Sequence, residues 1–91
     1  MRTIQRTNAF KRDYKREKSG QHHDLDQKLR NVLLALAADE ALPIRNRDHP
    51  LTGDWKGFRD CHLQPDLVLI YQKSEDVLRL IRLGSHSELF G

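Results

Sequence analysis

The sequence predicts an α+β fold of two layers, in which an N-terminal strand and a helical hairpin pack on a small antiparallel sheet. Three features predict it: helical periodicity in the first half of the chain, strand-like apolar runs in the second half, and short turns between those runs. The chain has 91 residues. Because so short a chain buries only about 60–65% of its unfolded surface, we expect one domain over residues 1–91.

The first element is a short edge strand at residues 2–6, which its β-branched Thr and Ile favour. A helix follows, because Thr7 or Asn8 is suited to cap it and the pair Ser19-Gly20 ends it. One face of this helix is apolar, and the other carries lysines and arginines. The apolar face consists of Ala9, Phe10 and Tyr14, and the basic face of Lys11, Arg12, Lys15 and Arg16.

The second helix is the most strongly marked element of the chain. It begins at Asp24 and ends at Leu42-Pro43, because proline disfavours helical geometry at the residue before it. A turn over residues 19–23 joins the two helices, and we expect His22 and His23 in it to be solvated. Apolar residues recur at i, i+4, i+7, i+8 and i+11, which predicts one apolar stripe. The stripe consists of Leu25, Leu29, Val32, Leu33 and Leu36.

Three strands are predicted after an irregular connector at residues 44–55. Residues 58–63 and 77–83 alternate between apolar and polar side chains, whereas residues 67–71 are continuously apolar, as expected of a central strand. The segments between these strands are short enough for hairpin turns. The expected order is therefore strand, helix, helix and three antiparallel strands.

Charge and cysteine content limit the partners and the cellular compartment that we expect for the protein. Residues 1–18 hold seven Lys or Arg against two acids, a net of +5, which suits either a solvated helix face or an acidic or nucleic-acid partner. The single cysteine, Cys61, excludes an internal disulfide and a thiolate zinc cluster. The longest apolar run, at residues 32–38, is too short to span a bilayer, and no signal-like run begins the chain. We expect a cytoplasmic protein without membrane contact.

Acid, base and anion-binding side chains gather around the predicted strands. Histidine changes its charge near pH 7, and arginine pairs well with phosphate. A small domain with several such residues either binds a phosphate-rich partner or cuts one. The residues that suggest this chemistry are His49, His62, Asp66, Arg82 and His86.

These residues stand in a longer pattern that resembles a known family. The pattern comprises segments 48–51 (Asp-His-Pro-Leu), 53–60 (Gly-Asp-Trp-Lys-Gly-Phe-Arg-Asp), 69–71 (Leu-Ile-Tyr), 82–86 (Arg-Leu-Gly-Ser-His) and 89–91 (Leu-Phe-Gly), with His62 and Pro65-Asp66 between them. It resembles the YafQ-type toxins of the RelE/ParE superfamily. The likeness is close in the C-terminal half, whereas the N-terminal half shares only the strand-helix-helix outline. A dispersed set in the correct order and spacing is far more specific than one short motif.

The resemblance implies a RelE-like fold and a ribosome-dependent endoribonuclease, the toxin of a bacterial type II toxin-antitoxin pair. Such toxins cut mRNA in the ribosomal A site without a metal or other cofactor. The implied partners are the ribosome, mRNA and a neutralising cognate antitoxin, with operator DNA reached only through the antitoxin complex. The functional positions that the resemblance carries over are His49, His62, Asp66, His86 and Phe90, with Arg82 and Trp55 as weaker candidates.

Metal-free RNA cleavage needs a base for the 2′-OH proton, an acid for the leaving 5′-oxygen and positive charge at the phosphate. On this basis we assign His86 as the general acid, either Asp66 or His49 as the base, and His62 to orient or share charge. Histidine suits both proton transfers, because its ordinary pKa of about 6.5 allows one neutral and one charged ring near pH 7.

The remaining candidates have a functional and a structural interpretation. Arg82 would hold the phosphate, or else pair with Asp60 or Asp66 across the strands. Phe90 would stack on a splayed base, or else close the core. Trp55 is either an RNA contact or a plug at the edge of the core, and Asp66 is either catalytic or an Asx-turn residue.

Two other functions, and a metal site as an alternative chemistry, compete with the metal-free nuclease. A toxin of the same fold can act without catalysis by docking on a protein target, as the ParE branch does. The chain can also serve chiefly as a transcriptional corepressor with its antitoxin, with phosphate contacts from the basic face of the first helix. A histidine and aspartate set also suits a metal, but the sequence lacks a tight pair such as His at i and i+4 on a helix, so we predict no metal site.

Overall fold

The protein is described by a computed structural model over residues 1–20, 22 and 24–91. Its sheet has five strands in the order β1-β5-β4-β3-β2. The central hairpins are antiparallel, whereas β1 runs parallel to β5. The predicted α+β fold is therefore confirmed, with a mixed sheet in place of an antiparallel one. The strands are β1 (Thr3–Arg6), β2 (His49–Pro50), β3 (Arg59–Gln64), β4 (Leu67–Lys73) and β5 (Val77–Gly84).

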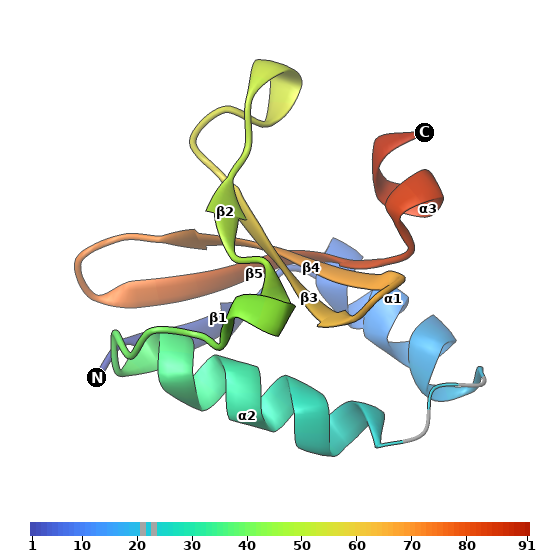
Figure 1. Ribbon diagram of the computed structural model, residues 1–91, viewed down its shortest axis with the longest axis horizontal. Coiled ribbons are helices and arrows are strands. Elements are labelled where there is room, and N and C mark those ends of the chain that lie inside the picture. The colour runs from blue at the N-terminus through green and yellow to red at the C-terminus, as the bar shows by residue number, and fades with distance from the viewer. Residues whose placement is uncertain (21, 23) are drawn as a thin grey trace.

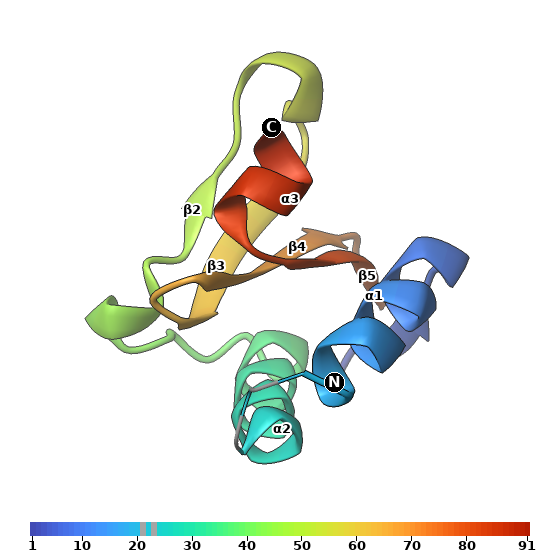
Figure 2. The same ribbon diagram turned by 90° about the vertical axis from the view of Figure 1, so that its right-hand side faces the viewer.

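Two helices, α1 (Asn8–Lys18) and α2 (Leu25–Ala37), cover one face of the sheet, as Figures 1 and 2 show together. The Thr7 hydroxyl caps α1 by accepting a hydrogen bond from the Phe10 N–H at 3.1 Å. In the described ranges 1–20, 22 and 24–91, no helix is both long and apolar enough to cross a membrane.

The prediction that α2 extends to Leu42-Pro43 was wrong, because the helix ends at Ala37. Asp39 adopts a left-handed conformation (φ 59°), and its N–H donates to the Leu36 carbonyl at 3.3 Å. The Glu40 N–H donates to the Ala35 carbonyl at 2.8 Å. These two bonds form a Schellman motif, with Asp in the position that glycine usually takes.

The expected turn between the helices is described only in part. His22 was expected to be solvated, but its ring is half-buried, with Nε2 at 3.0 Å from Glu17 Oε1 and Nδ1 at 3.3 Å from Gln64 Oε1. It thereby links the end of α1 to the end of β3. The prediction for His23 lies outside the described residues.

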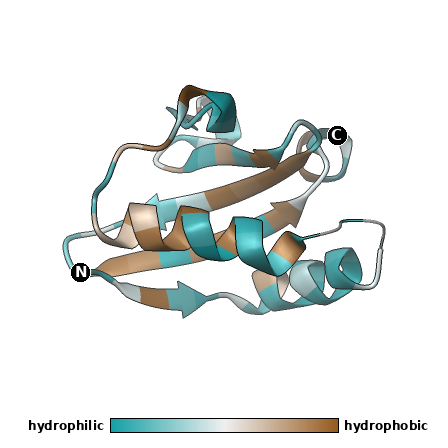
Figure 3. Ribbon diagram, turned by 60° about the horizontal axis from the view of Figure 1, so that its bottom comes forward, coloured by the Kyte–Doolittle hydropathy of each residue, from teal (hydrophilic) through white to brown (hydrophobic). Residues whose placement is uncertain are grey.

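The main hydrophobic core fills the space between the two helices and the sheet. In Figure 3, apolar residues line the sheet-facing side of α2 and the strands behind it. The predicted stripe is buried at four of its five positions, and Leu33 is partly buried against the same core. Among the described residues, fourteen buried side chains form this cluster, and its largest fully buried members include Phe10, Leu36, Leu67, Leu69, Tyr71, Leu78, Leu80 and Leu83.

The opposite face of the sheet carries a short C-terminal helix, α3 (His86–Phe90), and the loop between β2 and β3. Figures 1 and 2 show both on the side away from α1 and α2. A smaller apolar cluster lies beneath them, centred on Val68, Ile70 and Leu89. The predicted connector contains β2 and two 3-10 turns, η1 (Ile44–Asn46) and η2 (Gly53–Trp55).

Candidate active site

The alternation of β3 divides its side chains between the two faces of the sheet. Cys61 and Leu63 belong to the main core under the helices. Asp60 and His62 therefore face the other side, where α3 and the β2–β3 loop lie. Because His49 of β2 pairs in register with Asp60, the edge of the sheet brings a histidine next to the buried acid.

A groove of about 290 Å³ opens on this face. Four residues predicted from the sequence as site residues line it, and they come from β2, η2 and both ends of α3. The sequence separates the first from the last by about 40 positions, so only the folded sheet brings them together. The residues that line the groove are His49, Leu51, Thr52, Trp55, Asp60, His86 and Phe90.

The hydrogen bond of His49 fixes which ring nitrogen is free. Its Nδ1 lies 2.6 Å from the carbonyl oxygen of Arg47 and 3.2 Å from Oδ1 of Asp60. A carbonyl oxygen only accepts, so Nδ1 must carry the proton that it donates. In the neutral ring, Nε2 then keeps its lone pair and can take up a proton. The ring itself is half exposed, with 51% of its side-chain area accessible.

Asp60 is a site residue that sequence reasoning missed. Only 2% of it is exposed, and its Oδ1 is buried without a hydrogen bond among the described residues. Burial raises the pKa of the Asp60 carboxyl, and the charges of His49, His62 and His86 oppose that increase when these rings are protonated. A signal was present, since Asp60 stands two residues before His62, at the spacing that places two side chains on one face of a strand.

Helix α3 places His86 and Phe90 at the groove. The Ser85 hydroxyl accepts from the Glu88 N–H at 3.2 Å, and the Glu88 carboxylate accepts from the Ser85 N–H at 2.8 Å. This capping box, with Ser85 as the N-cap, starts the helix at His86. The other Glu88 oxygen lies 3.4 Å from Arg16 of α1, so an ion pair ties α3 to the layer behind the sheet.

Asp66 contacts α3 through a hydrogen bond with the backbone of His86. It is exposed in the turn between β3 and β4, and its Oδ1 accepts from the His86 N–H at 3.4 Å. This carboxylate therefore lies at the start of the helix that carries His86, and it is absent from the lining of the groove.

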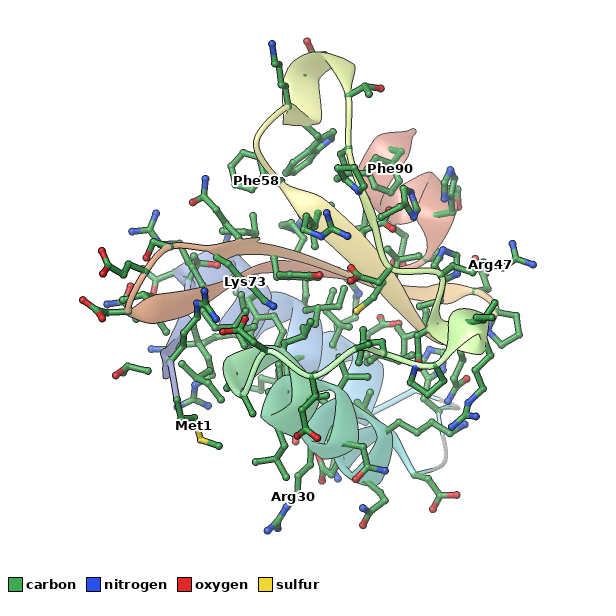
Figure 4. All side chains as sticks on the ribbon, turned by 60° about the vertical axis from the view of Figure 1, so that its left-hand side comes forward. Met1, Arg30, Arg47, Phe58, Lys73 and Phe90 are labelled. Atoms are coloured by element: carbon green, nitrogen blue, oxygen red, sulfur yellow. The ribbon has the colours of Figure 1, made fainter. Side chains whose placement is uncertain are left out.

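The rings of Trp55 and Phe90 form one wall of the groove, and Phe58 supports Trp55 from outside it. The Trp55 ring meets Phe58 and Phe90 edge-on, with centroid distances of 5.6 and 6.1 Å. The His86 and Phe90 rings lie 4.8 Å apart. Figure 4 shows Phe58 beside the β2–β3 loop and Phe90 on α3. Both Trp55 and Phe90 are partly buried against the small cluster, so each has a packing contact as well as an accessible surface.

His62 lies on the same sheet face but lines a neighbouring hollow. Its Nδ1 is 3.2 Å from the carbonyl oxygen of Pro65, so this nitrogen is also the protonated donor, and Nε2 is left free. We call the second depression the basic hollow. Its volume is about 390 Å³, and its walls are Arg45, Asn46, Arg47, His62, Leu63, Gln64 and Pro65.

Arg82 is held by a partner that the sequence did not indicate. Its Nε lies 2.6 Å from Oδ2 of Asp13, a residue of α1 that is 3% exposed. The alternative pairing of Arg82 with Asp60 or Asp66 was therefore wrong. Arg82 pairs in register with Ile70, next to an irregularity in the ladder, and is not among the residues that line the groove.

The described residues offer no close group of three or more His, Cys, Asp or Glu side chains that could hold a metal ion. The groove brings together two histidines and one buried carboxylate.

The fold of this chain, with two helices on one face of the sheet and the groove on the other, matches solved toxin structures, among them YafQ of Escherichia coli BL21(DE3) with a TM-score of 0.89 and 37% identity over all of both chains. A family model described as "Bacterial toxin of type II toxin-antitoxin system, YafQ" matches residues 2–91. The chain belongs to this YafQ family, as the sequence predicted.

Its similarity to known members extends over nearly the whole chain. The mRNA interferase toxin YafQ of Escherichia coli K12 is 38% identical over 91 residues, which cover 97% of this chain and 99% of that protein. The crystal structure of the E. coli DinJ-YafQ complex matches with a TM-score of 0.87 and 38% identity, covering all of both chains. A metal-bound toxin from Helicobacter pylori matches with a TM-score of 0.90 and 43% identity over 99% of this chain and all of that one. The E. coli name denotes the class of endoribonuclease predicted from the sequence.

Proposed function

We propose that this chain is an mRNA interferase, a ribosome-dependent endoribonuclease that cuts mRNA in the A site by acid-base attack of the 2′-OH, without a metal. The family membership supports the class of enzyme. The observation that carries the chemistry is the groove, in which a proton-accepting His49 backed by Asp60 lies with His86.

The base in this proposal is His49. Its free Nε2 removes the proton from the 2′-OH, and the oxygen then attacks the neighbouring phosphorus. The positive charge that forms on the ring lies next to the Asp60 carboxyl, whose Oδ1 is 3.2 Å from Nδ1. The Arg47 carbonyl orients the ring through its hydrogen bond with Nδ1, and the Asp60 carboxylate stabilises the charged form of the ring. Asp66, the other candidate base, lies at the His86 backbone, so it is better placed to position the acid.

The acid in this proposal is His86. Its protonated ring gives a proton to the 5′-oxygen as the bond from phosphorus to that oxygen breaks. The products are a 2′,3′-cyclic phosphate and a free 5′-OH. His62, two residues along β3 from Asp60, adds positive charge near the phosphate in its protonated form. Phe90 and Trp55 offer ring faces for the bases on either side of the cut.

The openness of the groove supports the dependence on the ribosome. His49 and His86 are both exposed, and the groove is too small to enclose a nucleotide chain. A site of this kind cannot by itself hold RNA with the 2′-oxygen, phosphorus and 5′-oxygen in line. The ribosome presents a codon in a fixed conformation and can supply that geometry.

The proposed partners are the ribosome, mRNA and a cognate antitoxin, in the cytoplasm. The E. coli relative was solved in complex with DinJ, which supports an antitoxin for this chain. Operator DNA would be reached only through that complex. Lys11, Arg12 and Lys15 are exposed and have no ion pair with any other described residue, whereas Arg16 is occupied by Asp13, Glu17 and Glu88.

The test is a toeprint of mRNA on programmed ribosomes with the purified protein, repeated with His86→Ala. We expect cuts inside the A-site codon with the wild type, none with the variant, and cyclic phosphate at the new 3′ ends. His22→Ala serves as the matched control, because this histidine lies in the layer behind the sheet. If a growth-arresting wild type leaves mRNA intact and His86→Ala still arrests growth, the protein acts without catalysis, as the ParE branch does.

A further inference from the structure

We propose that the basic hollow beside the groove is a second phosphate subsite, which holds the phosphate of the mRNA strand one nucleotide away from the bond that is cut. Arg45 and Arg47 would be its ligands, with His62 as the wall shared with the site. The proposal rests on the proposed function, and it assigns a role to two residues that the chemistry above does not use.

Position is the first observation. Asp60, which pairs with β2, lines the groove, and His62, two residues further along the same face of β3, lines the basic hollow. The basic hollow also extends around the edge of the sheet to Leu63, which faces the helices. Two residues along a strand span about 6.6 Å, a step comparable to one nucleotide of an extended RNA strand. Arg47 and His49 show the same two-residue offset on the other wall. A strand that passes the groove therefore meets the basic hollow next.

Charge is the second observation. Two arginines and a histidine line the basic hollow, and no acidic side chain is among its lining residues. Within residues 1–20, 22 and 24–91, neither the Arg45 nor the Arg47 guanidinium has a hydrogen bond or an ion pair. By contrast, Arg16, Arg59 and Arg82 are each paired with an acid. Two free guanidinium groups at one hollow suit the bidentate binding of phosphate oxygens.

The backbone is the third observation, because it holds the arginines in place. The buried Asn46 between them donates from Nδ2 to the His62 carbonyl at 2.7 Å. Arg47 adopts a left-handed conformation (φ 48°), which is uncommon for a residue with a side chain. Its carbonyl accepts from His49, and Figure 4 shows its side chain pointing away from the body of the protein. Residues 45–47 thus position the proposed base, His49, and also carry the two arginines of the basic hollow.

The test compares the wild type with Arg45→Gln/Arg47→Gln in single-turnover cleavage on programmed ribosomes. Glutamine keeps side-chain length and removes the charge. We expect kcat/KM to fall about tenfold or more, and the slope of log kcat/KM against log salt to become shallower by about one, as loss of one phosphate contact predicts. Arg45→Lys/Arg47→Lys should recover part of the loss. The matched control is Arg30→Gln/Arg79→Gln, which removes the same charge from exposed positions elsewhere.

A neutral linkage in the mRNA identifies the phosphate. Two synthetic messenger RNAs are compared, each with a single uncharged methylphosphonate. In one it replaces the linkage on the 5′ side of the cut, and in the other the linkage on the 3′ side. One of these two mRNAs should be cleaved by the wild type about as slowly as the unmodified mRNA is cleaved by Arg45→Gln/Arg47→Gln. The same neutral linkage should not slow cleavage by Arg45→Gln/Arg47→Gln any further. Equal slowing of both proteins by every neutral linkage would assign the arginines to ribosomal RNA and overturn the proposal, as would unimpaired cleavage by the variant. Failure of the proposed function is distinct, because the wild type would then cut no mRNA at all.

Discussion

The guanidinium of Arg82 and the carboxylate of Asp13 join the sheet to α1, with Nε and Oδ2 2.6 Å apart. Asp13 is buried, and it also accepts from the Leu83 N–H at 3.0 Å and from Arg16 Nη1 at 3.0 Å. Burial by itself would raise the pKa of the Asp13 carboxyl, but the hydrogen bonds from Arg82 and Leu83 and the charges of the two arginines outweigh it, so the pKa is lowered. One carboxylate thus fixes strand, helix and arginine together.

Asp13→Asn should destabilise the fold by about 2 kcal/mol at pH 7, since hydrogen bonds to charged groups contribute roughly 1.5–3 kcal/mol each. The direction in which this stability changes with pH follows from the lowered pKa of Asp13. The wild type has this stability at pH values above the unfolded pKa, near 3.8, and loses it as the pH falls through the folded value. Urea unfolding at pH 7 and pH 3 should show a smaller difference between the proteins in acid.

Asp26→Asn is the matched control for this measurement. Its carboxyl also has a lowered pKa, mainly through the Lys18 and Tyr14 side chains, but it is fully exposed. Exposed pairs contribute little to stability, so the loss should be small. A loss as large as that of Asp13→Asn would mean that burial of Asp13 is not what gives its contacts their strength.

Asp60→Asn should reduce cleavage by two orders of magnitude or more while leaving the protein as stable as the wild type or more stable. The amide keeps the shape of the carboxyl but cannot balance a charged His49 ring. It also relieves the fold of a buried acid whose Oδ1 has no hydrogen bond among the described residues. Toeprint assays and thermal unfolding on the same preparations measure the two effects.

The stability difference for Asp60→Asn should depend on pH in a definite direction. The pKa of Asp60 is raised in the folded state, so ionisation disfavours the folded wild type, and the penalty appears as the pH rises through the folded pKa. The variant lacks this penalty. Its advantage should grow with increasing pH and vanish in acid, and an advantage that grows in acid instead would show that Asp60 is stabilised as the anion.

Gly84→Ala should displace α3 and with it His86. A Cβ at this position would lie 2.9 Å from Arg16 Nη2, 3.2 Å from Glu88 Oε1 and 3.3 Å from Leu89 Cδ2. Arg16 can move, but only by giving up its contacts with the Leu83 carbonyl and Glu88. Overpacking of this kind costs about 1–3 kcal/mol, and we expect cleavage to fall about tenfold or more.

The comparison for Gly84→Ala is Gly20→Ala at the end of α1. There a Cβ would meet backbone oxygens no closer than 3.4 Å, which is an ordinary contact. Cleavage by this variant should match the wild type, and amide chemical shifts of residues 85–91 should move only in Gly84→Ala. Unchanged shifts there would show that Gly84 does not set the position of α3.

The sequence predicted the helices and central strands because their signals are periodic and local. The stripe of α2 and the continuous apolar run of β4 each depend on neighbours in the chain. The resemblance supplied His49, His86, Trp55 and Phe90, which the structure brings to one groove. Their roles in catalysis and binding stay predictions.

The features that the sequence did not predict depend on distant contacts or on very short elements. Strand β2 has only two residues, His49–Pro50, too few for any alternation to show. Asp13 and Arg82 are 69 positions apart, and no local pattern selects that partner among the other acids. Helix α3 is five residues long, yet the capping-box pattern of Ser85 and Glu88 was legible in the sequence. The burial of Asp60 could not be predicted either, because it depends on the pairing of β2 with the edge of β3.

Phe90→Leu separates the aromatic from the packing role of this residue. Leucine retains apolar contact with the small cluster that Phe90 covers, so thermal stability should fall only slightly. It lacks the ring face that would stack on an mRNA base, an interaction of about 1–3 kcal/mol, so KM on programmed ribosomes should rise about tenfold. Phe90→Tyr should keep both properties and behave as the wild type. Phe58→Leu is the second control, because Phe58 contacts Trp55 but is absent from the groove lining. If Phe90→Leu lowers stability and leaves KM unchanged, Phe90 only closes the small cluster.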